Sequence, residues 1–195
     1  MHASAPLPED ATVRHVIDAN QSSFSVQVFA TGLLSAFGHS PKIAIRDFQG
    51  DVVFKVGGSP LAGAQMTLRI RASSLEIADG ISDKDRDEIN RRMWQEVLET
   101  SDYPEIVYEC SGVTASGSGD RYWVALKGEL TLHGTTKSMP VSARVSVNGS
   151  SLRATGEFAL RQSDFGIAPV SAAAGTIRVK DEVKCAFDIL ALRQQ

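Results

Sequence analysis

The sequence predicts an all-β protein: a closed or nearly closed antiparallel β-barrel with one inserted α-helix. Apolar and polar residues alternate with a period of two through about nine or ten segments, and the turns between them are rich in Gly, Ser and Asn. One long segment shows the period of an α-helix instead. Closure into a barrel is expected because it removes the unpaired strand edges that an open sheet would expose.

Length and composition are those of one globular domain. The chain has 195 residues, of which 43% are hydrophobic and 22% charged, so it can bury a sizeable core. The net charge of −3 gives no basic footprint for nucleic acid or an anionic membrane. No apolar run approaches the roughly 20 residues that a membrane-spanning helix needs. We expect residues 1–11, which lack periodicity, to be a flexible tail, and residues 12–195 to form the barrel domain.

The N-terminal residues MHASAPLPED lack the positively charged and apolar regions of a secretory signal. The chain as given is therefore expected to be cytoplasmic. A processed or re-engineered N-terminus would look the same and would fit a periplasmic protein.

The first elements are short. Residues 13–19 and 24–30 are β-rich runs that flank a polar turn at residues 20–23. Residues 31–37, TGLLSAF, carry apolar side chains at helical spacing and predict a short helix that ends at Gly38.

The alternation is clear in FGHSPKIAIRDFQG, residues 37–50, and in the DVVFKV run that follows. Ile43 and Ile45 share one face of the first run, and Val52 and Phe54 share one face of the second. Because a glycine separates the two runs, we predict an antiparallel hairpin that turns at this glycine.

Residues 82–100, SDKDRDEINRRMWQEVLET, are the long predicted helix. Ser82 is placed to cap it, and acidic residues crowd its first turns, where they complement the helix dipole. Ile89, Met93 and Val97 form an apolar stripe, which indicates that one face of the helix packs on the sheet.

Further strands are predicted at residues 64–72, 106–113, 122–133, 139–148, 152–161, 176–179 and 182–192. Small residues recur on the inward phase: Ala64, Ala143, Ala154 and Gly156. They leave volume for a cavity that would hold one slim ligand, although small residues also permit tight packing. Replacing Gly156 with Leu is then expected to block the lumen and leave the barrel folded.

Among the histidines, His39 is the main functional candidate because it lies at the predicted junction of a helix and a strand. It could cap the helix, bind a ligand headgroup or act as a base beside Asp47 or Asp164. His133 adjoins a Gly turn and is expected to be a turn residue.

The two cysteines, Cys110 and Cys185, lie on the apolar phase of predicted strands and are expected to be buried thiols. The sequence does not decide whether they form a disulfide. No metal site is expected, because no Cys and His spacing typical of zinc is present.

Four fragments in order resemble the YceI-like family: KIAIRDFQGDVVF, EIVYECSGV after a Tyr-Pro pair, LKGELTLHGTTKSMPVSARV and FALRQSDFGI. In the last fragment, Arg161, Asp164, Phe165 and Gly166 match the family's R-x-x-D-F-G-like signature. The resemblance spans residues 13–191. It implies a bacterial protein with an extended lipocalin-like barrel. It also implies transport or binding, without catalysis, of a long polyisoprenoid such as a polyprenyl quinone of the ubiquinone type or a polyprenyl phosphate derivative.

The inward phases and the resemblance together give candidate ligand-binding residues in the lumen and at its mouth. These are Val26, Val28, Phe37, His39, Ile43, Ile45, Met66, Leu68, Leu126, Leu130, Val145, Ala154, Gly156, Phe158, Arg161, Asp164 and Phe165. The polar candidates at the mouth are His39, Ser40, Arg161 and Asp164.

Three functions are therefore carried forward as hypotheses. The first is a non-catalytic carrier of a polyisoprenoid lipid, the second a small acid–base enzyme that uses His39, and the third a ligand-free stress-response or interaction barrel. The expected partner is a hydrophobic lipid, with no nucleic acid, no catalytic cofactor and no transmembrane segment; a homodimer is left open.

Overall fold

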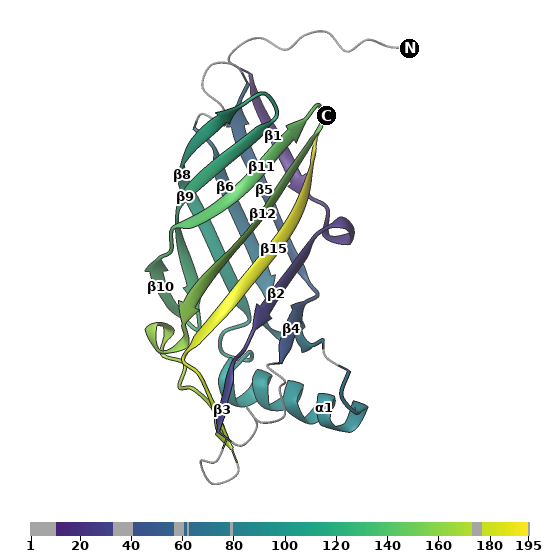
Figure 1. The fold of residues 1–195 in the computed structure, drawn as a ribbon, viewed down its shortest axis with the longest axis vertical. Helices are drawn as coiled ribbons and strands as arrows, with labels where there is room; N and C mark the ends of the chain where they lie inside the picture. The colour runs from purple at the N-terminus through teal and green to yellow at the C-terminus, as the bar shows by residue number, and fades with distance from the viewer. Residues whose placement is uncertain are drawn as a thin grey trace.

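The computed structural model of the protein describes residues 11–32, 41–56, 61, 63–78, 80–172 and 177–194. It is an elongated antiparallel barrel with a helix lying across one end, here called the helix end (Figure 1). The C-terminus lies at the opposite end, here called the far end (Figure 1). Of the predicted tail, residues 1–11, only Ala11 is among the described residues, and its carbonyl oxygen accepts from Val56 N at 2.8 Å.

Eight strands close the barrel, as the alternation predicted. They are β1 (Thr12–Ile17), β5 (Phe48–Lys55), β6 (Gln65–Arg71), β8 (Glu105–Ser118), β9 (Arg121–Leu132), β11 (Val141–Asn148), β12 (Ser151–Arg161) and β15 (Glu182–Arg193). Neighbours in this order are hydrogen-bonded, and β1 also pairs with β15, which completes the ring. A short strand, β10 (Thr135–Ser138), folds back on β9.

Three further strands extend one side of the barrel towards the helix end: β2 (Ser23–Gln27), β4 (Lys42–Ile45) and β7 (Leu75–Ile77). β2 pairs with β15, β4 with β2, and β7 with β4. Each continues a barrel strand: β2 follows β1, β4 precedes β5, and β7 follows β6. Three long strands are therefore each broken in two, and the extension consists of their pieces β2, β4 and β7.

The breaks lie at one level and their backbone groups are satisfied. The 3-10 turns η1 (Ala19–Gln21) and η3 (Ala72–Ser74) make two of them, and the corner at Arg46 and Asp47 makes the third. Arg46 N donates to Ser74 O at 3.1 Å, and Arg71 N donates to Asp47 O at 3.0 Å. Because these groups bond across the corner, the strands bend there while both amides keep hydrogen-bond partners.

The predicted hairpin at Gly50 is wrong. β4 and β5 do not pair with each other; Gly50 lies inside β5, opposite Leu68 of β6. A Cβ on this glycine would lie 2.3 Å from the carbonyl oxygen of Thr67. The glycine therefore permits a close approach between two strands, and a local sequence pattern cannot distinguish that role from a turn.

The predicted short helix at residues 31–37 is also wrong where it can be compared. Thr31 and Gly32 belong to β3 (Ala30–Gly32), which pairs with β14 (Ile177–Val179). β14 in turn pairs with β13 (Ser171–Ala172), so that a small second sheet forms at the helix end. Residues 33–37 lie outside the described residues. Pairing with a strand distant in sequence overrides the helical spacing here.

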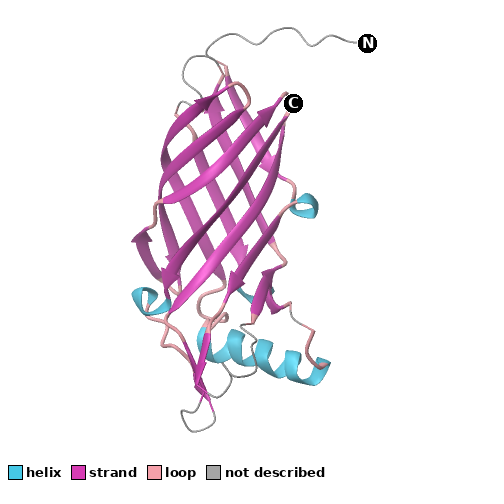
Figure 2. Ribbon diagram, viewed as in Figure 1, coloured by secondary structure: helices cyan, strands magenta, loops and turns pink. Residues whose placement is uncertain are grey.

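The long helix is confirmed with a shorter C-terminal end. It consists of α1 (Asp83–Arg92) and a π-helical turn, η4 (Met93–Val97), and Ser82 Oγ caps it by accepting from Asp85 N at 3.2 Å. Figure 2 shows it as the one long helix among the described segments. Two hydrogen bonds fasten it to β7: Ile77 N donates to Asn90 Oδ1 at 2.9 Å, and Trp94 Nε1 donates to Leu75 O at 2.7 Å.

The alternation decides which side chains enter the barrel. On β9, Val124 and Leu130 are buried, whereas Trp123, Lys127 and Glu129 are exposed. The core therefore lies inside the barrel, and the charged residues lie on its outer face.

Within the described part of the chain, no helix is both long and apolar enough to cross a membrane.

Candidate functional site: an apolar cavity in the barrel

The barrel encloses a cavity of about 470 Å³. Every barrel strand except β1 contributes to its wall, together with β2, β4, β7 and the helix. The volume falls in the range of small-molecule sites, which is roughly 300–1,000 Å³. The closed ring of strands thus leaves part of its interior unfilled.

Apolar side chains dominate the wall. Aliphatic and sulfur-containing residues from the strands include Val26, Ile43, Ile45, Met66, Leu68, Leu126, Leu130, Val141, Ala143, Val145, Leu152, Ala154, Cys185 and Ile189. Aromatic residues at the wall are Phe24, Tyr108, Phe158 and Phe187. Such a surface favours a hydrocarbon ligand, because its burial removes apolar area from water on both partners.

The polar groups at the wall are few and several already have partners. Tyr108 Oη donates to Met139 O at 3.1 Å, and Gln162 Nε2 donates to Lys180 O at 3.0 Å. Burial raises the pKa of the Tyr108 hydroxyl, so this group stays protonated. Arg92 is the charged residue at the described wall, and its Nε lies 3.2 Å from Glu96 Oε2. An ionised ligand group deep in this cavity would therefore lack a counter-ion.

The helix forms the wall where the cavity approaches solvent. Ile89, Met93, Val97 and Leu98 all line the cavity, and Ile89 remains 43% exposed. Arg92, on the same helix, lines it as well. Ile89 touches both the cavity and solvent, so one opening of the cavity lies at the helix end, here called the mouth.

Most of the candidate residues from the sequence come together around this cavity. Its wall includes Val26, Val28, Ile43, Ile45, Met66, Leu68, Leu126, Leu130, Val145, Ala154 and Phe158. Phe37, His39 and Ser40 lie outside the described residues.

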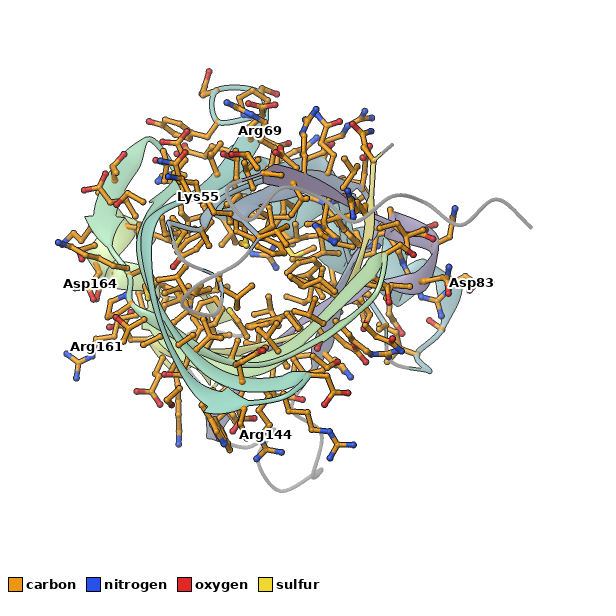
Figure 3. The ribbon with its side chains drawn as sticks, turned by 90° about the horizontal axis from the view of Figure 1, so that it is seen from above. Lys55, Arg69, Asp83, Arg144, Arg161 and Asp164 are labelled. Carbon is orange, nitrogen blue, oxygen red and sulfur yellow. The ribbon has the colours of Figure 1, made fainter. Side chains whose placement is uncertain are left out.

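Four candidates do not line the cavity. Gly156 lies beneath the ring of Phe187, and Phe165 is 1% exposed within the packed core. Arg161 and Asp164 are exposed, and Figure 3 shows their side chains pointing away from the lumen. The alternation already contained the signal for Arg161, because this residue shares its phase with the exposed Arg153 and not with Phe158.

The sequence reasoning also missed part of the wall. The sequence predicted the apolar stripe of the helix. It did not predict that this stripe lines a cavity. Leu75 and Ile77 of β7 and Phe187 of β15 were missed in the same way. Their contribution depends on how distant strands are joined, for which the local sequence carries no signal.

His15 is a buried polar residue next to this site. It is 2% exposed, its ring stacks on Phe54 with centroids 5.1 Å apart, and neither ring nitrogen has a hydrogen-bond partner among the described residues. Burial lowers the pKa of its imidazole, and the nearby charge of Arg193 lowers it further. His15 does not line the cavity, and burial favours the uncharged form of its ring.

The acid–base hypothesis gains no support from the described residues. His133 Nε2 lies 2.7 Å from Glu99 Oε2, but neither residue lines the cavity, and the ring of Tyr103 packs against His133 with centroids 4.3 Å apart. The contact joins the chain after the helix to the β9–β10 turn, as expected for a turn histidine. No group of three metal-ligating side chains occurs in the described ranges.

Comparison with known proteins agrees with this architecture. The family profile described as a YceI-like domain matches residues 15–191. The crystal structure of Burkholderia cenocepacia BcnA gives a TM-score of 0.68 at 20% identity, over 89% of this chain and 98% of that chain. A polyisoprenoid-binding domain from Saccharophagus degradans, implicated in plant cell wall breakdown, gives 0.66 at 14% identity, over 92% and 98% of the two chains.

A YceI protein from Campylobacter jejuni gives a TM-score of 0.59 at 13% identity, over 78% of this chain and 84% of that chain. No curated protein matches the sequence. At these identities the solved structures establish the fold alone, whereas the family profile covers most of the chain. The chain belongs to the YceI-like family.

Proposed function

We propose that the protein is a non-catalytic carrier that holds the chain of a polyisoprenoid lipid inside the barrel. The observation that carries this proposal is the cavity of about 470 Å³, whose described wall is apolar and has one charged residue, already ion-paired. The polyisoprenoid-binding domain of Saccharophagus degradans, which has a similar fold, supports the same ligand class.

The energetics favour an apolar chain. Each buried methylene group contributes about 0.8 kcal/mol, so an isoprene unit contributes a few kcal/mol in favour of binding. Ordering a flexible chain opposes this gain and sets the limit on affinity. A long chain therefore needs no strong polar contact to remain in the barrel.

The charge of the cavity wall also bears on the charge of the ligand headgroup. A neutral quinone head is compatible with a lumen whose described wall lacks an unpaired cation, whereas a phosphate head would have to stay in water at the mouth. We therefore propose a polyprenyl quinone of the ubiquinone type as the ligand and a polyprenyl phosphate as the weaker alternative. No catalytic cofactor is proposed.

Native mass spectrometry of protein purified from several expression hosts tests the proposal directly. We expect a co-purified apolar mass, or one-to-one uptake of added polyprenyl quinone by the delipidated protein. A clean apo mass from every host, together with no uptake of either prenyl lipid, would falsify the proposal. Uptake of the phosphate in preference to the quinone would reject the headgroup assignment and retain the carrier.

A further inference from the structure

A shallow hollow of about 360 Å³ lies on the outer face of β9, β11 and β12, towards the far end of the barrel. Its lining residues on the outer phase of the strands, here called the basic hollow, are Arg121, Trp123, Arg144, Ser146, Arg153 and Thr155. Strand register places them together: Ser146 lies between Arg121 and Arg153, and Arg144 lies between Trp123 and Thr155. Three guanidinium groups thus surround two hydroxyl groups on one face.

Two of these arginines have no carboxylate partner in the part of the chain that the structure describes. Arg153 pairs with Asp188 through two contacts, of 2.8 Å and 2.6 Å. Arg144 instead lies over the ring of Trp123, with its Cζ 4.6 Å from the ring centroid. Among the described residues, neither Arg121 nor Arg144 has a carboxylate within ion-pair distance.

Several other arginines of the outer face are paired with a carboxylate. Arg14 pairs with Asp51 at 3.0 Å, and Arg69 pairs with Glu105 at 3.2 Å. Arg121 and Arg144 of the basic hollow have no such partner among the described residues, in a protein whose net charge is −3. Its chemistry fits a partner that carries phosphate or carboxylate groups, which guanidinium groups bind in a bidentate manner.

Exposed apolar side chains adjoin this charge. Trp123 is 60% exposed, and Leu192 of β15 is 41% exposed and lies opposite Ser151 at the same end of the barrel. Ile89, at the cavity mouth, is the other large hydrophobic residue that is strongly exposed in the described chain. Tryptophan beside basic residues is the composition of surfaces that lie at the interface of a membrane with water.

The shape of the charged region distinguishes a membrane from nucleic acid. Nucleic-acid surfaces carry a continuous basic stripe that follows the phosphate backbone. Here the positive charge is short, because Asp120 precedes Arg121 in the chain, Glu157 follows Thr155 on the outer phase of β12, and Asp188 lies beside Arg153. Separate lipid headgroups at a bilayer surface suit so short a patch.

We propose that the basic hollow docks the protein on an anionic phospholipid bilayer, with Arg121 and Arg144 on lipid phosphates and Trp123 in the interfacial layer. The site lies outside the barrel, on the outer phase of its strands, and does not depend on what occupies the cavity. For a lipid carrier, it would supply the surface on which the protein meets its donor or acceptor membrane.

Co-sedimentation with phosphatidylcholine vesicles, with and without phosphatidylglycerol, tests the docking. The wild-type protein should bind only the anionic vesicles, and added salt should weaken the binding by screening it. The double variant Arg121→Glu/Arg144→Glu should lose about tenfold or more of this binding. Thermal unfolding of each variant would establish that the barrel is intact.

A matched charge reversal on the other side of the barrel serves as the control. Lys55 and Arg69 lie opposite Arg144 in the view along the barrel axis (Figure 3). Lys55→Glu/Arg69→Glu changes the net charge by the same amount, and we expect it to retain most of the vesicle binding. Equal loss in the two double variants would overturn the proposal, because net charge alone would then explain the binding.

The fluorescence of Trp123 gives a second readout. The chain has two tryptophans, and Trp94 is partly buried and hydrogen-bonded to Leu75 O. Anionic vesicles should shift the emission of the wild type to shorter wavelength, and Trp123→Phe should remove this shift. A shift of equal size with pure phosphatidylcholine vesicles would contradict the charge-dependent docking.

Soluble anions separate this proposal from a free-phosphate site. Vesicle binding should persist in millimolar inorganic phosphate at constant ionic strength. Competition by inorganic phosphate, without a general salt effect, would replace the membrane with a small-anion ligand. Uptake of polyprenyl quinone from detergent micelles should be unchanged in Arg121→Glu/Arg144→Glu, so failure of the docking and failure of the carrier function are distinguishable.

Discussion

The ring of Phe187 lies directly over the backbone of Gly156. The two residues are register partners on β15 and β12, and a Cβ built on Gly156 would lie 2.6 Å from Phe187 Cζ. The same Cβ would lie 2.6 Å from the carbonyl oxygen of Ser142 on β11. Phe187 lines the cavity, whereas Gly156 does not. The absent side chain of Gly156 therefore makes room for an aromatic wall residue, and the expectation that it lines an open ligand path is corrected.

Gly156→Ala should lower the free energy of unfolding by about 1–3 kcal/mol, because the new methyl group overpacks a strand contact whose backbone cannot retreat. Gly156→Leu should be more harmful and should not leave a barrel of normal stability. Urea denaturation monitored by circular dichroism measures both. Gly112→Ala is a suitable control, since its Cβ would meet only Lys127 Cβ, at 3.9 Å.

Ala154→Leu should reduce lipid uptake and leave the thermal midpoint close to that of the wild type. Ala154 lines the cavity, so its added bulk enters ligand space. Ala159→Leu on the same strand provides the control, because Ala159 is exposed on the outer phase of β12. The two variants should be compared for uptake of a polyprenyl quinone; unchanged uptake by Ala154→Leu would show that the ligand does not pass this position.

Loosening the helix should speed ligand exchange. Asn90 is 6% exposed, and its Oδ1 is the partner of Ile77 N, while Trp94 Nε1 is bonded to Leu75 O. Asn90→Ala leaves the Ile77 amide without its partner, at a cost of about 1–3 kcal/mol. The dissociation rate of a fluorescent prenyl probe should rise in Asn90→Ala and in Trp94→Phe. The exposed Lys84, when replaced by Ala, should leave this rate unchanged.

His15 should make the barrel less stable in mild acid. Its folded-state pKa is lowered from an ordinary value near 6.5, so the unfolded chain binds a proton more readily than the folded protein does. The stability associated with the neutral ring is therefore present above pH 6.5 and is lost as the pH falls from there through the folded-state pKa. His15→Phe should reduce the fall in thermal midpoint between pH 7.5 and about pH 5.5. Identical pH dependence in the two proteins would rule out this role.

The two thiols should differ in access and share low reactivity. Burial raises the pKa of Cys185 to about 12 and also raises the pKa of Cys110. Both cysteines are free, and only Cys185 lines the cavity. In Cys110→Ser, the remaining thiol should react slowly with a small neutral reagent and more slowly still when prenyl quinone is bound. Fast reaction in the loaded protein would place the lipid elsewhere.

Local patterning was sufficient for several features. Alternation separated inward residues such as Val124 from outward residues such as Lys127, because successive side chains of a strand point to opposite faces. It also placed most of the cavity wall correctly and, when followed strictly, placed Arg161 outside. The N-cap at Ser82 was also predictable, because it depends on a residue only three positions away in the sequence.

Features that depend on contacts between distant segments could not be predicted from the sequence. The local sequence predicts a turn at Gly50 and a helix at Thr31. In the structure, Gly50 pairs with β6 and Thr31 pairs with β14. The net charge of the chain did not predict the unpaired charge at Arg121 and Arg144. Strand register decides which arginines have a carboxylate neighbour. The sequence by itself determined the periodicity, and with it the barrel and its apolar interior. The tertiary structure alone decided where the strands break, how the helix forms part of the cavity wall and which outer residues meet, because these depend on pairings between segments far apart in the chain.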